Sequence, residues 1–424
     1  MACSAARAPR RAWENPLSDK FRFGRYENPF LSVVWRRPPP KGTTCEPLLL
    51  ETEDRALARG WLYSRGGEKT VVCVMHPRAD FSNHYVAPGL LEAGFAVLCV
   101  NSRWLGGDAT LVHEFILLDV AASLRAARAR YERVVLCGNS GGGSLYTFYL
   151  SQALAPAGGR LTDTAFGFPF DLNRFEMPRA DAMVYLGAHP GEGHFLLNAI
   201  DPSVTDEGDP LSCDPPLDLY NPDNGFREPP EPSRYAEAFL AKYRAAQRAR
   251  IERLDALARE RIRRRVEGRL RWKSGGTVAD RRASIATDYL VVYRTDADPR
   301  CVDLSLDPSK RDYGSLWGRR PDLINYGAIG FGRVLAPEAW LSTWSGISSR
   351  AEIERTGPAM TLPCLLVSYT ADNCIFPSDA ELIARSLGTK DLARAEVEGD
   401  HYGFPAEAAE AAVRTTAEWI RKSG

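Results

Sequence analysis

The sequence lacks the features that mark several large classes of protein. Its formal net charge is +0, which argues against a general nucleic-acid binder because such proteins carry a basic excess. No stretch is long and apolar enough to span a bilayer, and Met1–Trp13 lacks the apolar core of a signal peptide. The nine cysteines are scattered without a C-x-x-C spacing, which favours reduced core residues. We therefore expect a cytoplasmic protein that binds neither nucleic acid nor membrane.

One short motif stands out against this background. In Cys137–Gly143, Ser140 has a glycine two positions away on each side, and the apolar run Arg133–Leu136 comes directly before it. A serine hydroxyl is a poor nucleophile until a base takes its proton, and it must stand clear of the backbone. A sharp strand-to-helix turn achieves this, and glycines at Gly138 and Gly142 relieve the crowding. The motif predicts a nucleophilic serine, although such a turn can also be plain punctuation or a phosphate cradle.

Apolar, β-branched runs recur along the chain and predict buried parallel strands. They lie at residues 70–75, 95–100, 133–137, 182–186 and 364–369, with helix-like segments at 86–92, 112–130 and 144–154. Alternating strands and helices predict an α/β fold, with a mostly parallel sheet covered by helices on both faces. The chemistry of such a sheet lies at the carboxyl ends of its strands, where Ser140 also lies.

Only six histidines are available to serve Ser140 as a base. His401 follows a strand-like run at 393–398 and precedes a closing helix, so we place it in a loop at a strand end. Asp372 comes just after the predicted strand at 364–369 and is our choice for the acid that orients this histidine. Asp379 and Asp400 are the alternatives for that role.

The chain order Ser140, Asp372, His401 on such a sheet resembles the α/β-hydrolase fold superfamily. The resemblance covers roughly residues 47–200 and 358–424. It implies that Ser140 is the nucleophile, that His401 takes its proton and returns it to the leaving group, and that Asp372 orients the imidazole.

The resemblance also implies an oxyanion hole, with the backbone N–H of Gly141 as one donor. Family members usually carry His-Gly after the strand that corresponds to residues 70–75, whereas this chain has His76-Pro77-Arg78. Because Pro77 has no N–H to donate, we assign the second donor to the backbone N–H of Arg78.

Four further residues are expected to contact the substrate, namely His76, His84, Tyr85 and His194. His76 also suits a structural role in its loop, and His84 and Tyr85 also suit packing at a helix start. The stretch from His189 to His194 superficially suggests a metal site, but no third ligand stands out, so we predict no metal.

A segment too long for a connecting loop separates the strands at 182–186 and 364–369. It opens with a proline-rich, acidic stretch at 201–232, and a long amphipathic helix at about 233–270 follows. In the family this position commonly holds a cap over the nucleophile. The resemblance therefore implies a large, mainly helical cap at 190–357, inserted after the sixth strand.

Two clusters inside this segment leave alternatives open. The run Arg261–Arg265 suits either a phosphate or CoA site or a solvated helix face, on which Glu260 and Glu267 lie at pairing distance. A group of aromatic residues suits either a substrate pocket or the segment's own core. Its members are Tyr313, Trp317, Tyr326, Phe331, Trp340 and Trp344.

The predicted organisation is an N-terminal extension at 1–46, a core in two parts at 47–189 and 358–424, and the cap at 190–357. Aromatic residues in the extension favour docking over disorder, either against the cap or in a homodimer. They are Phe21, Phe23, Tyr26, Phe30 and Trp35.

The sequence thus predicts a serine hydrolase that needs no cofactor and cleaves a carboxylic ester, lactone or thioester of an organic small molecule. The runner-up is a C–C bond hydrolase of the vinylogous diketone type, because members of that group also carry Gly-Asn-Ser-x-Gly-Gly and Asn139 fits the pattern. A non-catalytic binding protein on the same fold is the third alternative.

Overall fold

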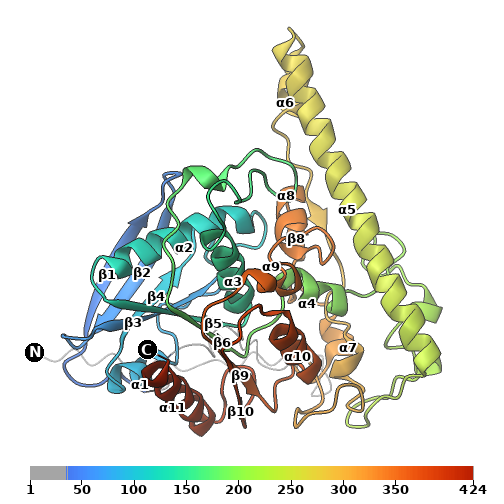
Figure 1. Ribbon diagram of the computed structural model, residues 1–424. Helices are drawn as coiled ribbons and strands as arrows, with labels where there is room; N and C mark the ends of the chain where they lie inside the picture. Colours follow the sequence, from blue (N-terminus) through green and yellow to red (C-terminus); the bar gives the residue numbers. More distant parts are fainter. Residues whose placement is uncertain (1–34, 36, 424) are drawn as a thin grey trace, which may run out of the picture.

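An eight-stranded sheet forms the centre of the computed structural model, which describes residues 35 and 37–423 (Figure 1). In chain order its strands are β1 (Thr44–Glu51), β2 (Leu57–Ser64), β3 (Thr70–His76), β4 (Ala96–Asn101), β5 (Arg133–Asn139), β6 (Ala182–Leu186), β9 (Cys364–Tyr369) and β10 (Leu392–Val397). The order across the sheet is β1-β2-β4-β3-β5-β6-β9-β10. Only β2 runs antiparallel to its neighbours, so the predicted α/β class with a mostly parallel sheet is confirmed.

Helices cover both faces of this sheet. One face carries α1 (Ala87–Glu92) and α11 (Ala406–Lys422), and the other carries α2 (His113–Arg128), α3 (Gly141–Ala153) and α10 (Pro377–Ser386). Along β3, Cys73 and Met75 join one hydrophobic core while Val72 and Val74 join the other, because successive side chains of a strand point to opposite faces. Burial on both faces explains why the predicted strands are continuous apolar runs.

The segment between β6 and β9 contains many short elements and one long helix. It holds α4 (Glu192–Ala199), α5 (Glu237–Lys273), α6 (Val278–Ala283), α7 (Pro321–Ile324), α8 (Pro337–Ala339), α9 (Ile353–Thr356) and a two-stranded sheet of β7 (Leu290–Val291) and β8 (Val334–Leu335). Single turns of 3₁₀ helix lie in this segment at Pro215–Leu217, Pro222–Asn224, Pro299–Cys301 and Gly357–Ala359, and a further one lies before β6 at Leu172–Arg174. A π-helical turn lies at Trp340–Trp344. We call residues 190–357 the insertion.

The insertion has a hydrophobic core of its own, separate from the two cores of the sheet. Trp340 and Trp344 are fully buried there with Leu196 from α4 and Ile251 from α5. Tyr326, in contrast, is 44% exposed. The aromatic group that the sequence singled out therefore serves mainly as core of the insertion.

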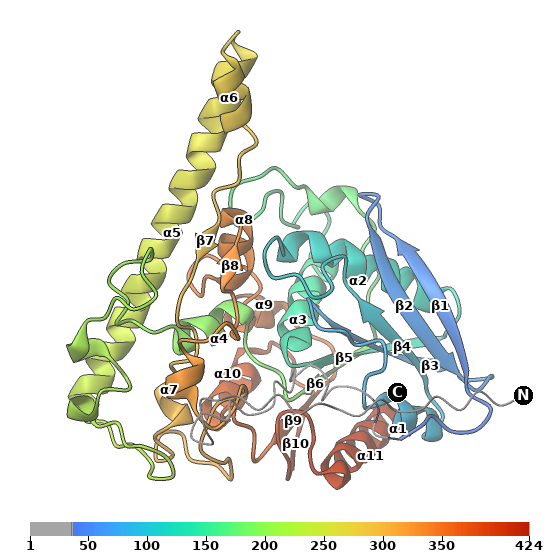
Figure 2. The same ribbon diagram turned by 180° about the vertical axis from the view of Figure 1, so that it is seen from behind.

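Helix α5 runs along one side of the molecule and projects beyond it, with α6 folded back against its end (Figures 1 and 2). Its side chains are buried against the insertion as far as Ala258, and beyond that point Val266 and Leu270 are more than half exposed. Arg263 pairs with Glu267 and Arg264 with Glu260. These pairs favour the solvated-face interpretation of this arginine run.

The predicted N-terminal extension lies mostly outside the described residues, and so do Phe21, Phe23, Tyr26 and Phe30. Trp35 is described and packs edge-on against Tyr63, with ring centroids 5.2 Å apart. Within the part of the chain that the structure covers, no helix combines the length and the apolar character that a membrane crossing requires.

Candidate active site

Ser140 lies at the turn between β5 and α3, in a strained backbone conformation. Its φ of 54° is positive, which is uncommon for a residue with a side chain. A Cβ on Gly142 would overlap the carbonyl oxygen of Met75, and one on Gly138 would lie 2.6 Å from the carbonyl oxygen of Gly142. Both glycines are thus required for close backbone packing, as the sequence motif predicted.

Two hydrogen bonds connect Ser140 to His401 and Asp372. The distance from His401 Nε2 to Ser140 Oγ is 3.0 Å, and that from His401 Nδ1 to Asp372 Oδ2 is 2.8 Å. The other oxygen of Asp372 accepts the backbone N–H groups of Cys374 at 2.7 Å and Ile375 at 2.9 Å. Because a carboxylate only accepts, Nδ1 carries the imidazole hydrogen and Nε2 accepts the serine O–H. The loops after β9 and β10 thus bring the three predicted residues together.

The two alternative acids have other partners. Asp379 Oδ1 accepts a hydrogen bond from His194 Nε2 at 3.1 Å, and its Oδ2 lies 3.3 Å from Arg300 Nη1. Asp400 accepts the backbone N–H groups of Tyr402 and Phe404 and so shapes the loop that carries His401. Of the three candidates, Asp372 is thus the one that lies at hydrogen-bonding distance from His401 Nδ1.

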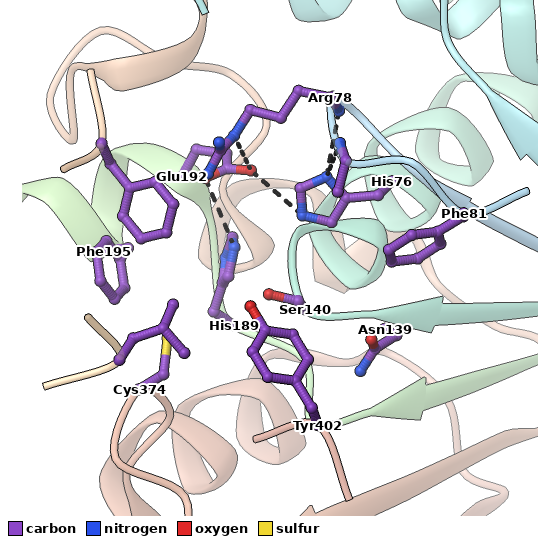
Figure 3. Close-up of a pocket in the computed structure, with 13 residues that line it drawn as sticks. His76, Arg78, Phe81, Asn139, Ser140, His189, Glu192, Phe195, Cys374 and Tyr402 are labelled. Atoms are coloured by element: carbon purple, nitrogen blue, oxygen red, sulfur yellow. Dashed lines mark hydrogen bonds and ion pairs between the residues drawn. The ribbon is translucent and has the colours of Figure 1, made fainter. Parts of the chain in front are cut away.

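A small cavity of about 10 Å³ adjoins Ser140, on the scale that holds one water molecule (Figure 3). Its lining from the core consists of His76, Arg78, Ala79, Phe81, Asn139, Ser140, His189, Cys374 and Tyr402. Glu192, Phe195, Leu316 and Phe331 contribute to the lining from the insertion. The insertion therefore forms part of the cavity wall beside Ser140.

The prediction that the Arg78 backbone N–H completes the oxyanion hole is wrong. That N–H donates to His76 Nδ1 at 3.2 Å, so it is directed at the imidazole. The Arg78 side chain does line the cavity, where its guanidinium lies 4.4 Å from the centre of the Phe331 ring. It also lies within 3.3 Å of Asp108 and 3.8 Å of Glu192.

Three of the residues expected to contact substrate do not line the cavity. His84 Nε2 donates to Asn139 Oδ1 at 3.2 Å, and the Tyr85 hydroxyl lies 3.0 Å from that of Tyr369. Both residues pack behind the serine turn, just before α1. This is the alternative that the sequence analysis gave for them, namely packing at a helix start. His194 is held by Asp379. Of this group, only His76 faces the cavity.

Glu192, the first residue of α4, was missed by sequence reasoning. Its carboxyl group is buried with oxygens 3.9 Å from His76 Nε2, 3.7 Å from His189 Nε2 and 3.8 Å from Arg78 Nε. Burial raises the pKa of Glu192, and the Arg78 cation opposes that rise. His189 follows β6, so the rule that placed Ser140 at a carboxyl end also applies to it. Glu192 carried no such signal.

Burial keeps both neighbouring imidazoles neutral. It lowers the pKa of His189 to about 3, with a further lowering by His401 and Arg78. It likewise holds the pKa of His76 well below its ordinary value, with Arg78 acting in the same direction. Within residues 35 and 37–423, no group of three or more His, Cys, Asp or Glu side chains forms a metal site.

No protein-family model matches the sequence, and no curated protein matches it. Solved structures give distant likenesses. The α/β hydrolase GrgF from Penicillium sp. is 11% identical, with 90% of this chain and 99% of that chain covered and a TM-score of 0.47. An esterase domain from Rhodothermus marinus is 11% identical over 89% and 98% of the two chains, with a TM-score of 0.42. The Pyrococcus furiosus esterase Pf2001 is 11% identical over 92% and 99%, with a TM-score of 0.43.

These scores are all below 0.5, so the likenesses carry no argument about this chain, and its own geometry is the evidence. One antiparallel strand, β2, lies near the edge of an otherwise parallel sheet. Ser140 occupies the strained turn between β5 and α3, and its partners follow β9 and β10 in the order acid, then histidine. Sheet order, serine turn and chain order together agree with the resemblance to the α/β-hydrolase fold that the sequence indicates.

Proposed function

We propose that the protein is a serine hydrolase that cleaves a carboxylic ester, lactone or thioester of an organic small molecule. The observation that carries the proposal is the 3.0 Å contact between His401 Nε2 and Ser140 Oγ, with Nδ1 bound to Asp372. This arrangement activates a serine hydroxyl, because the histidine can take its proton while the carboxylate holds the ring in the required tautomer.

In the proposed reaction, Ser140 Oγ attacks the carbonyl carbon as its proton passes to His401 Nε2. Asp372 stabilises the resulting imidazolium, and the N–H of Gly141 at the start of α3 donates to the oxyanion. His401 then protonates the leaving alcohol or thiol, which leaves an acyl-enzyme on Ser140. Attack by water, activated by the same histidine, releases the carboxylic acid and restores the serine.

The insertion acts as the cap in this proposal. Phe195, Leu316 and Phe331 reach the cavity from it and offer apolar surface to an organic substrate. Since the cavity is about 10 Å³, the cap must shift to admit any substrate larger than water. A cytoplasmic location and a homodimer stay predictions from the sequence.

The test is covalent labelling by a fluorophosphonate, followed by mass spectrometry of the intact protein. Wild type should gain a single adduct that Ser140→Ala loses, and His401→Ala should label far more slowly. Turnover of p-nitrophenyl acetate and of an aryl thioester should follow the same order. Retained turnover in Ser140→Ala, or an adduct that persists in this variant, would contradict the proposal.

The C–C hydrolase alternative rested on Asn139. In the structure the Asn139 side chain donates to the carbonyl oxygen of Leu186 at 2.7 Å and accepts from His84 Nε2. These contacts brace the serine turn and serve either reaction equally, so Asn139 does not favour C–C cleavage. Consumption of a coloured dienol substrate, compared with release of an alcohol from an ester, separates the two activities.

A further inference from the structure

We propose that the imidazole of His76 supplies the second hydrogen bond to the oxyanion, through its Nε2–H group. This group would serve as the second oxyanion donor, a role that the sequence analysis assigned to the backbone N–H of Arg78. The inference rests on the proposed function, because the oxyanion arises only if Ser140 attacks a carbonyl group.

The hydrogen-bond pattern around His76 fixes which ring nitrogen carries hydrogen. His76 Nδ1 lies 3.2 Å from the backbone nitrogen of Arg78 and 3.0 Å from that of Ala79, and both donate to it. A ring nitrogen that accepts two N–H groups has no hydrogen of its own. Because burial keeps this imidazole neutral, its one N–H is at Nε2.

Because of this pattern, the first backbone N–H groups after His76 are not directed at the oxyanion. Pro77 has no N–H, and the N–H groups of Arg78 and Ala79 both point at the His76 ring. The loop therefore presents the imidazole in their place. Its two amides hold the ring in one orientation, which is the preorganisation that an oxyanion donor requires.

The Nε2 atom of His76 faces the start of α3, where Gly141 supplies the other donor. A Cβ on Gly141 would lie 2.9 Å from this atom, so the imidazole approaches the backbone more closely than a residue with a side chain allows. His76 and Ser140 line the same cavity (Figure 3). Nε2–H and the Gly141 N–H thus lie at the same end of α3, beside the nucleophile.

The neighbouring carboxyl group leaves Nε2–H available. Glu192 Oε1 lies 3.9 Å from it, which is beyond hydrogen-bonding distance. An ionised Glu192 would oppose an oxyanion, and burial lessens that opposition because it raises the pKa of Glu192. A neutral imidazole beside such a group can polarise a carbonyl without first losing a proton.

Two substitutions separate a donor role from a structural role. In His76→Asn, the amide oxygen takes the place of Nδ1 and still accepts from Arg78 and Ala79, but no donor remains at the place of Nε2. In His76→Gln, the amide NH₂ reaches the place of Nε2, but the acceptor for the loop is lost. We expect His76→Asn to lower kcat for p-nitrophenyl acetate by roughly 10²–10³-fold with little change in KM, and His76→Gln to retain more activity.

A structural role predicts the opposite order, with His76→Asn near wild type and His76→Gln impaired, and that result would overturn the proposal. Inhibition by phenylboronic acid gives a second readout, because it forms a tetrahedral anion on an activated serine. Its affinity should fall in His76→Asn by at least about 10-fold and recover in part in His76→Gln. Equal affinity in the three proteins would also overturn the proposal.

Ser140→Ala distinguishes a failure of the proposed function from a failure of the proposed role of His76. If this variant retains turnover, the proposed function fails and the role of His76 fails with it. If turnover is lost in Ser140→Ala while His76→Asn matches wild type, the proposed function stands and only the inference about His76 is wrong.

Discussion

At the scale of single residues, Asp372 is the group whose role is most directly tested by substitution. Asp372→Asn keeps the shape of the side chain but replaces a purely accepting carboxylate by an amide, which favours the wrong tautomer of His401. We expect kcat to fall by roughly 10⁴-fold while the fold is retained. Steady-state kinetics with p-nitrophenyl acetate would measure the loss.

Asp379→Asn is the matched control for this substitution. Asp379 is buried and binds His194 and Arg300, so its loss should lower stability while the catalytic rate of the folded fraction changes little. A large fall in kcat for Asp379→Asn, with Asp372→Asn unaffected, would show that the acid has been assigned to the wrong residue.

We expect Glu352 to make the stability of the protein depend on pH. Burial raises the pKa of Glu352 from 4.5 to about 8, and one of its carboxyl oxygens has no hydrogen-bond partner. The folded protein therefore binds this proton more tightly than the unfolded chain does. The contribution of Glu352 to stability is complete below pH 4.5 and is lost as the pH rises through about 8.

Glu352→Gln removes this titration and leaves an amide of similar shape. As the pH rises from 5 to 8, the unfolding free energy of the variant should increase relative to that of wild type, by up to about 1.4 kcal/mol per pH unit. Urea unfolding at both pH values measures the difference. A difference that stays constant across this range would mean that Glu352 titrates normally in the folded protein.

At the scale of elements, α5 carries two kinds of arginine, and only one should matter for stability. Arg250 is 1% exposed and donates to Glu207 and to the carbonyl oxygens of Asp201 and Tyr293. Arg250→Met removes the donor from the two carbonyl oxygens and leaves Glu207 with Arg253 as its remaining partner, so we expect a loss of about 3 kcal/mol in unfolding free energy.

Arg264 is the matched position on the projecting half of the same helix. Its side chain is 66% exposed and pairs with Glu260 one turn away. Arg264→Met should change the unfolding free energy by less than about 0.5 kcal/mol, because exposed ion pairs contribute little. Urea unfolding of both variants tests the contrast, and equal losses would contradict it.

The strands were predictable because burial on both faces leaves a continuous apolar run, as in β3. The serine turn was predictable because glycines at Gly138 and Gly142 are a local necessity. The short helices of the insertion were not predicted, since their positions depend on packing around Trp340 and Trp344 and not on a local period.

The site was predictable where the chemistry is set by strand ends, as for Ser140, Asp372 and His401. The second oxyanion donor was not predictable, because it depends on the direction in which the backbone N–H of Arg78 points. The Arg78 N–H turns to His76 because the buried imidazole needs donors for Nδ1, and no sequence pattern records that choice. Glu192 reaches the cavity only because α4 starts beside Ser140, which is a matter of tertiary packing.

At the scale of the whole molecule, the insertion supplies part of the cavity wall, and under the proposed function it should limit the size of the acyl group. Phe195 lines the cavity and packs edge-on against Phe331, with ring centroids 4.9 Å apart. Phe195→Ala should raise kcat/KM for p-nitrophenyl butyrate relative to the acetate ester, because truncation enlarges the cavity. It should also cost about 3 kcal/mol of stability.

Unchanged selectivity between the two esters, in a variant that is still folded, would contradict this account of the insertion. A conservative control is Leu270→Ala on the projecting end of α5. Leu270 is 60% exposed and far along the helix from the buried half, so its truncation should leave both selectivity and stability unchanged.

The pairing of β6 with β9 joins two parts of the chain that the whole insertion separates. Ser140 belongs to the first part, and Asp372 and His401 belong to the second. The turn after α5 contains Gly275, around which a Cβ would meet no atom within 4 Å. A cut at this turn would divide the protein into two halves, with Ser140 in one and Asp372 and His401 in the other. Under the proposed function, neither half should turn over substrate alone, so turnover would report the reassociation of the two fragments.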